Sequence, residues 1–152
     1  DKMNLKFVKS GEKKRLLAEL NKSFGISKID YILIAGGKKK IRGFSGNMTR
    51  EEIKEFTNLA NVEIIGSYFF KKDRFLRLSF DGSHIFKNQL KIGIVNLNEK
   101  NLENWMNGKD LILKSEKGVV ILKKGDDFFG CGISDGEKIF NYVPRERRIR
   151  KS

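Results

Sequence analysis

The residues best suited to chemistry in this chain are basic side chains placed beside glycine or at strand ends. Gly108 and Lys109 follow a predicted helix, where a glycine lets backbone N–H groups and a cation approach a phosphate closely. Lys114 follows the next predicted strand, and residues 145–151 hold five basic side chains and one acidic one. These features predict contact with a polyanion. The alternatives are a plain helix C-cap at Gly108 and solvated charges elsewhere.

The terminal bases form the densest cationic run of the chain. They are Arg145, Arg147, Arg148, Arg150 and Lys151. Arginine binds phosphate with two parallel hydrogen bonds and stacks on exposed bases, so this run is predicted to contact RNA. A frayed, solubilising terminus is the alternative.

A second set of bases gathers at two predicted turns in the first half of the chain. Its members are Lys38, Lys39, Lys40 and Arg42, beside Gly36-Gly37, together with Lys71 and Lys72. They are predicted as secondary RNA contacts. A charged hairpin tip facing solvent is the alternative.

Residue combinations for catalysis or metal binding are missing from the sequence. His84 is the single histidine and Cys131 the single cysteine, so neither a histidine-rich metal site nor an internal disulfide is available. Asp126-Asp127 has ordinary turn chemistry, and no serine has a base other than His84. We therefore expect no enzyme activity, no cofactor and no metal.

The composition supports a folded, basic protein. The 152 residues include 12 Phe and carry a formal net charge of +13, which favours nucleic acid or an acidic surface as partner. The other reading is a solvated lysine surface. No apolar run is long enough to cross a membrane, and the charged start has no signal-peptide pattern. The cytoplasm is the expected location.

Hydrophobic periodicity and turn residues predict a mixed α+β chain. Helices are predicted over Ser10–Phe24, where Ser10 can cap the start, from the Thr49–Glu52 capping box to Ala60, and over Glu99–Met106 behind Asn98. Gly82–Leu90 is predicted as a further short helix. The predicted strands are 29–35, 39–44, 62–70, 74–80, 91–97, 110–114, 118–124, 128–133 and 138–143. The paired rings Phe69/Phe70 and Phe128/Phe129 are predicted to pack mainly in the core. Because neighbours on a strand point to opposite faces, the alternative is that one ring of each pair is exposed.

The second half resembles a PUA domain, a unit named from pseudouridine synthases and archaeosine transglycosylases. The resemblance rests on Trp105–Lys114, Gly118–Leu122 and Phe128–Gly132, and covers about residues 91–149. It implies a β-pseudobarrel in which the Gly108 loop contacts RNA and Lys114 lines the RNA-binding cleft.

Two families look most similar. Glu63–Lys72 with Arg74–Leu78 resembles the pre-PUA strands of the nuclear-import-protein-seven family of ribosome-biogenesis factors. Lys138–Arg148 resembles the ending of the PUA-like tail of Sun-family RNA cytosine-5 methyltransferases and similar archaeal stand-alone proteins. The catalytic domain of those methyltransferases has no counterpart, since neither a cysteine pair nor a glycine-rich cofactor loop is found.

The sequence as a whole predicts two units. Residues 1–88 form a pre-PUA-like α+β domain, and residues 89–152 form a PUA-like RNA-binding domain with a basic tail. The predicted function is non-catalytic binding of structured rRNA or tRNA through a basic cleft, in ribosome assembly or RNA modification, beside a methyltransferase or a ribosome-assembly protein. A protein-interaction adaptor with incidental charge and an RNA-acting enzyme are the alternatives.

Overall fold

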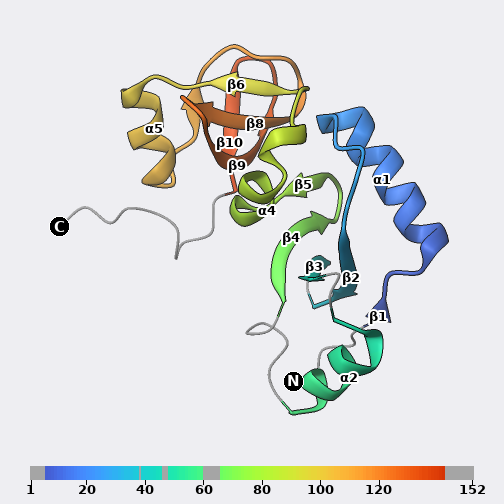
Figure 1. Cartoon of the computed structure of the whole chain (residues 1–152). Coiled ribbons are helices and arrows are strands. Elements are labelled where there is room, and N and C mark those ends of the chain that lie inside the picture. The colour runs from blue at the N-terminus through green and yellow to red at the C-terminus, as the bar shows by residue number, and fades with distance from the viewer. Residues whose placement is uncertain (1–5, 38, 46–47, 60–65, 143–152) are drawn as a thin grey trace.

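Two five-stranded sheets organise the computed structural model, which describes residues 6–37, 39–45, 48–59 and 66–142 (Figure 1). The first sheet has the order β1-β2-β3-β4-β5, and the second has the order β6-β8-β9-β10-β7. All pairings are antiparallel except that of β6 with β8, which is parallel. The structure is therefore α+β, as the sequence predicts.

The first sheet is built from the first half of the chain. Its strands are β1 (Lys6–Phe7), β2 (Tyr31–Gly36), β3 (Lys40–Ser45), β4 (Ser67–Lys72) and β5 (Leu76–Leu78). The helix α1 (Ser10–Phe24) packs along one face, and α2 (Arg50–Leu59) lies against the other (Figure 1). Two short elements follow, α4 (Phe80–Ile85) and the 3-10 turn η1 (Lys87–Gln89).

The second sheet curls into a half-barrel at the other end of the molecule (Figure 1). Its elements in chain order are β6 (Ile94–Asn96), the helix α5 (Glu99–Met106), β7 (Leu111–Ile112), β8 (Gly118–Lys124), β9 (Asp127–Ser134) and β10 (Lys138–Asn141). Trp105 of α5 is fully buried in its hollow with Leu111, Leu122 and Ile139. The indole Nε1–H donates a 2.8 Å hydrogen bond to the Phe129 carbonyl, which satisfies its polar atom inside the core. This curled sheet is the predicted PUA-like pseudobarrel.

Most predicted helix ends are confirmed by their hydrogen bonds. The Thr49 hydroxyl accepts from the Glu52 N–H at 3.1 Å, while a Glu52 carboxylate oxygen accepts from the Thr49 N–H at 3.3 Å. Asn98 caps α5 by accepting from the Asn101 N–H at 2.8 Å. The expected cap at Ser10 is wrong: Lys9 holds the N-cap position, so Ser10 is already the first helical residue.

One core spans both sheets. Ile121, Phe128 and Cys131 on the outer face of the second sheet are buried in the same cluster as the α1 and β4 side chains of the first. The Leu78 N–H donates to the Cys131 sulfur at 3.4 Å, and the Gly130 N–H donates to the Ser83 hydroxyl at 3.1 Å. The two sheets thus share one apolar interior. The division of the chain into two domains between residues 88 and 89 stays a prediction.

A β-bulge explains how both rings of one aromatic pair are buried, as the favoured interpretation of the sequence predicts. Phe69 and Phe70 are both fully buried, although neighbours on a regular strand face opposite ways. The pairing of β3 with β4 shifts between Ile41 and Arg42, where Ile41 faces Phe70 and Arg42 faces Tyr68. Phe69 is the extra residue, and the bulge turns its ring inward against Tyr31 and Phe86. In the second pair, Phe128 is buried and Phe129 is half-buried on the other face.

Gly132 shows how tightly the half-barrel is packed, and it carries a stability prediction. A Cβ at this position would lie 2.5 Å from Ile139 Cγ2 and 2.8 Å from Trp105 Cη2. Gly132→Ala should therefore lower the free energy of unfolding by about 1–3 kcal/mol through overpacking. Urea unfolding would measure this. Gly11→Ala on α1, where the nearest atom is 3.8 Å away, should be neutral or stabilising, and equal losses in both variants would contradict the packing argument.

Candidate nucleic-acid interface

The Gly108 loop closes the C-terminal end of α5. Gly108 has a φ of 83°, in the left-handed region that suits glycine. Its N–H donates to the Trp105 carbonyl at 3.0 Å, and the Lys109 N–H donates to the Asn104 carbonyl at 2.9 Å. Both amides are thus used within the loop rather than turned to a ligand. What this loop offers a phosphate is the exposed Lys109 side chain.

Asn141 ties this loop to the end of β10. Its side-chain Nδ2 donates to the carbonyls of Trp105 at 2.8 Å and Lys109 at 3.0 Å, and its backbone N–H donates to Asp110 Oδ1 at 2.8 Å. The other Asp110 oxygen pairs with Lys138 at 3.5 Å. Sequence reasoning missed Asn141, because its partners lie more than 30 residues earlier in the chain. The loop therefore has a fixed position beside the strand that leads to the basic C-terminal run.

Lys114 lies at a different place on the half-barrel. It is exposed and lines a hollow of about 570 Å³ together with Lys91, Ile94, Asn96 and Glu116. Gly108 and Lys109 are not among the residues that line this hollow. The structure thus places Lys109 and Lys114 on one domain without bringing them into one pocket.

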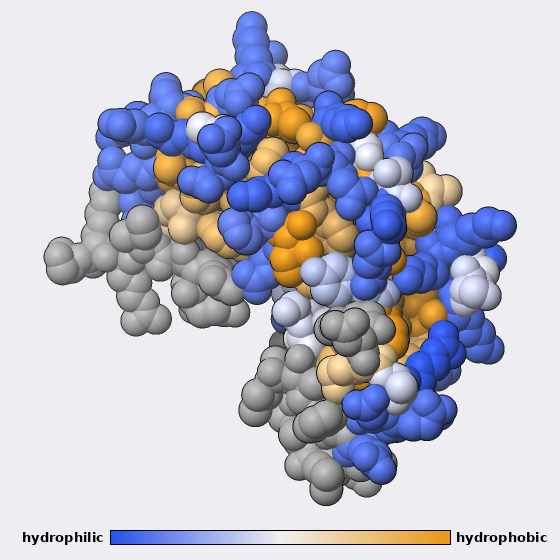
Figure 2. All heavy atoms as spheres, viewed as in Figure 1, coloured by the Kyte–Doolittle hydropathy of each residue, from blue (hydrophilic) through white to orange (hydrophobic). Residues whose placement is uncertain are grey.

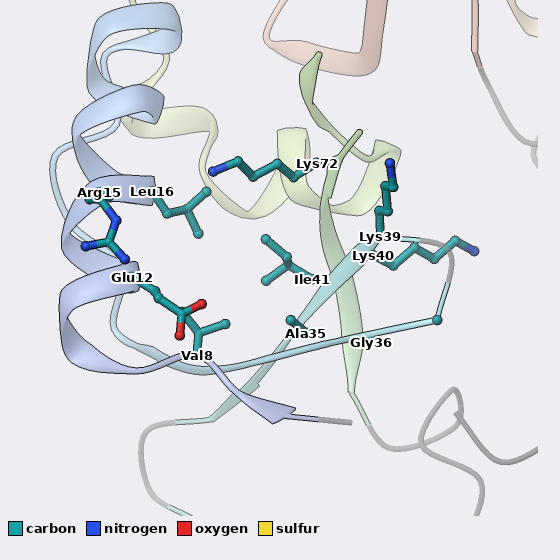
Figure 3. Close-up of a pocket in the computed structure, with 11 residues that line it drawn as sticks. Val8, Glu12, Arg15, Leu16, Ala35, Gly36, Lys39, Lys40, Ile41 and Lys72 are labelled. Carbon is teal, nitrogen blue, oxygen red and sulfur yellow. The ribbon is translucent and has the colours of Figure 1, made fainter. Parts of the chain in front are cut away.

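The bases of the first half meet around the β2–β3 hairpin. Lys40 on β3 is paired with Lys71 on β4, and the Lys72 N–H donates to the Lys39 carbonyl at 2.9 Å. The hairpin and α1 enclose a hollow of about 530 Å³ with an apolar floor that includes Leu16 (Figure 3). The Lys72 side chain extends toward α1, where it pairs with Glu19 at 3.5 Å, whereas Lys40 lines the hollow with its side chain extending away from α1 (Figure 3).

Arg42 and Lys40 belong to the opposite face of this sheet. Lys40 Nζ lies 4.8 Å from the centre of the Tyr68 ring, and Arg42 Cζ lies 6.0 Å from it. Burial raises the pKa of the Tyr68 hydroxyl above its usual value, although the positive charge of Arg77 opposes this shift. Lys40 and Arg42 on β3 thus lie beside Lys71 and Lys72 on β4, with Lys39 in the turn just before β3, while Lys38 lies outside the described residues.

The five terminal bases also lie outside the described residues, so their predicted role stays a prediction. Exposed lysines elsewhere are widely spread, with Lys14 and Lys22 on α1 and Lys100 on α5. Figure 2 likewise shows hydrophilic residues over most of the viewed face, with small hydrophobic patches between them.

Groups suited to catalysis do not converge in the part of the chain that the structure describes. There, no three His, Cys, Asp or Glu side chains are grouped so that they could hold a metal ion. Asp126 and Asp127 are exposed at the β8–β9 turn, and His84 is exposed on α4. None of the described helices has the length and apolar character needed to cross a membrane.

The half-barrel with its helix and glycine loop defines a protein carrying a PUA-like domain. Residues 93–149 match the family model described as the methyltransferase RsmF PUA domain. The match covers 57 of 152 residues and supports the resemblance to the tail of Sun-family methyltransferases. No curated protein matches the chain. A PUA domain suggests RNA binding, whereas the similarity of the first half to the nuclear-import-protein-seven family stays a prediction.

The Asn141 side chain should hold the Lys109 loop in place. Asn141→Ala removes two hydrogen bonds to loop carbonyls, each worth about 0.5–1.5 kcal/mol, so the free energy of unfolding should fall by about 1–3 kcal/mol. Chemical denaturation would measure the loss. Asn88→Ala at an exposed position is the matched control, and a loss of the same size there would refute the role of Asn141.

Cys131 should behave as a core residue and not as a reactive thiol. Burial raises the pKa of its thiol to about 12, whereas an unfolded cysteine titrates near about 8.5. The stability conferred by the neutral buried thiol is complete below the unfolded pKa and is lost as the pH rises through the folded one. At pH 8 a thiol reagent should label the native protein slowly, because it reaches the buried Cys131 only when the fold opens locally. The protein unfolded in urea should be labelled rapidly. Rapid labelling without urea, absent in Cys131→Ala, would contradict this.

Proposed function

We propose that this protein is a non-catalytic RNA-binding adaptor that acts in the cytoplasm in ribosome assembly or in rRNA or tRNA modification. The observation that carries the proposal is the PUA-family match over a domain whose α5–β7 loop displays an exposed lysine in a fixed position. In this proposal Lys109, Lys114 and the terminal bases hold structured RNA by its phosphates. The partner protein is an RNA methyltransferase or a ribosome-assembly factor.

The chemistry of the described residues supports binding over turnover. Two acids of the half-barrel are engaged in structural contacts: Asp110 accepts from the Asn141 N–H, and Asp135 accepts from the N–H groups of Glu137 and Lys138. Those two N–H groups lower the pKa of Asp135, as expected for a carboxylate that caps a turn. A general acid needs a raised pKa, so this carboxylate is suited to hold the turn.

Charge reversal at the two exposed lysines tests the proposal. Lys109→Glu and Lys114→Glu should each weaken binding to tRNA and rRNA fragments, and removal of one phosphate contact should reduce the slope of log affinity against log salt by about 1. Binding is measured by fluorescence anisotropy at two salt concentrations. Lys100→Glu makes the same charge change on the exposed face of α5 and should have a smaller effect.

Truncation after Val143 tests the terminal bases separately. Loss of the five cations should weaken RNA binding and flatten its salt dependence further. Unchanged affinity and slope would remove the tail from the interface. If the full chain binds no RNA at low salt, the protein-interaction adaptor becomes the better proposal.

A further inference from the structure

Several aromatic rings in the described residues have a cation over them, and three of these rings lie on β4 or at the end of β10. Lys40 Nζ lies 4.8 Å from the centre of the Tyr68 ring on β4. Lys138 Nζ lies 5.0 Å from the centre of the Phe140 ring on β10. Arg77 Cζ of β5 lies 4.4 Å from the centre of the Tyr142 ring, just after β10. The last contact joins the first sheet to the second.

The strand pairing puts the cations of the first sheet in one row. Lys40 on β3 is opposite Lys71 on β4, and Lys71 is opposite Arg77 on β5. Directly paired residues share a face, and like charges placed opposite each other are destabilising. Asp73 offsets part of this repulsion, because its two oxygens each accept from Arg77 at 3.3 Å. Three cations against one acid leave this row electrostatically suited to a polyanion.

The row of cations leads to two exposed rings near the end of β10. Phe140 lies on the outer side of the second sheet, because its neighbour Ile139 faces the half-barrel core, and Tyr142 follows just after the strand, where Arg77 contacts its ring. Phe140 is 37% exposed and Tyr142 is 49% exposed, which places them among the five exposed large hydrophobic residues found in the described parts of the chain. Arg77 is nearly buried and forms a salt bridge with Asp73, so its guanidinium group has a fixed position against the Tyr142 ring.

We propose that these residues form a binding track for an unpaired RNA strand. The cation–aromatic strip consists of Lys40, Tyr68, Lys71, Arg77, Phe140 and Tyr142. Bases stack on the exposed rings of Phe140 and Tyr142, while Lys40 of β3 and Lys71 of β4 meet the phosphates and the nearly buried Arg77 of β5 holds the Tyr142 ring in place. The proposal rests on the RNA-binding function above and adds the class of RNA. It also makes the contact between the two sheets a part of the site.

The strip is tested with a short oligouridine and a blunt RNA duplex as probes. Tyr142→Ala and Phe140→Ala in the full chain should each lower the affinity for oligouridine about tenfold. The reason is that each base stacked on an aromatic side chain raises the affinity by about this factor. Affinity for the duplex should stay within about twofold, because paired bases cannot stack on these rings. Tyr142→Phe keeps the ring and should bind oligouridine like the wild type.

Controls separate this inference from the proposed function. Ile92→Ala removes another exposed apolar side chain, outside the strip, and should leave both affinities unchanged. Unfolding curves check that each variant is folded. If Tyr142→Ala is unstable, the affinity of Phe140→Ala for oligouridine tests the strip alone. Wild-type affinity for oligouridine in the alanine variants, with weaker binding in Lys109→Glu, would overturn the strip and leave RNA binding intact. Failure of the wild type to bind either probe would overturn both.

Discussion

The packing of the β8–β9 hairpin against α4 and β5 is the constraint on which the rest of the molecule depends. The hairpin has two apolar faces: Val120 and Leu122 fill the half-barrel, while Ile121 and Cys131 enter the core of the first sheet. A strand that is buried on both sides cannot shift by one residue without exposing one set of side chains. This double burial fixes how the PUA-like domain sits on the first sheet, and therefore how residues from both can meet.

The local structure was predictable because short-range patterns determine it. The capping box at Thr49 and Glu52, the Asn98 cap and the glycine at the end of α1 all form as their spacing indicates. Strand β8 also has its predicted bounds, because a short β-branched run lies there between turn residues. The pseudobarrel was predictable from the family resemblance, because its helix, glycine loop and strands follow in a characteristic order.

What could not be predicted depends on contacts between distant parts of the chain. The bulge at Phe69 depends on the register of β3 against β4, which alternation within β4 cannot reveal. Asn141 reaches carbonyls on the far side of β7, and Arg77 reaches a ring 65 positions later in the chain. Neither contact has a signature in the sequence, since an asparagine at a strand end and an arginine within a strand are both ordinary. The candidate site is therefore the part of the protein that sequence reasoning saw least completely.

The distribution of charge bears on the RNA recognition that we propose for this protein. The family resemblance predicts a basic cleft, but exposed lysines are spread over α1, α5 and both sheets. A diffuse positive surface attracts RNA over distance without choosing a sequence or a shape. Selection must then come from groups with fixed positions, and the described residues supply these as Lys109 on its clamped loop and Arg77 between Asp73 and Tyr142. Since both lie beside the end of β10, the same strand end orders the phosphate contact proposed for Lys109 and the stacking contact proposed for the strip.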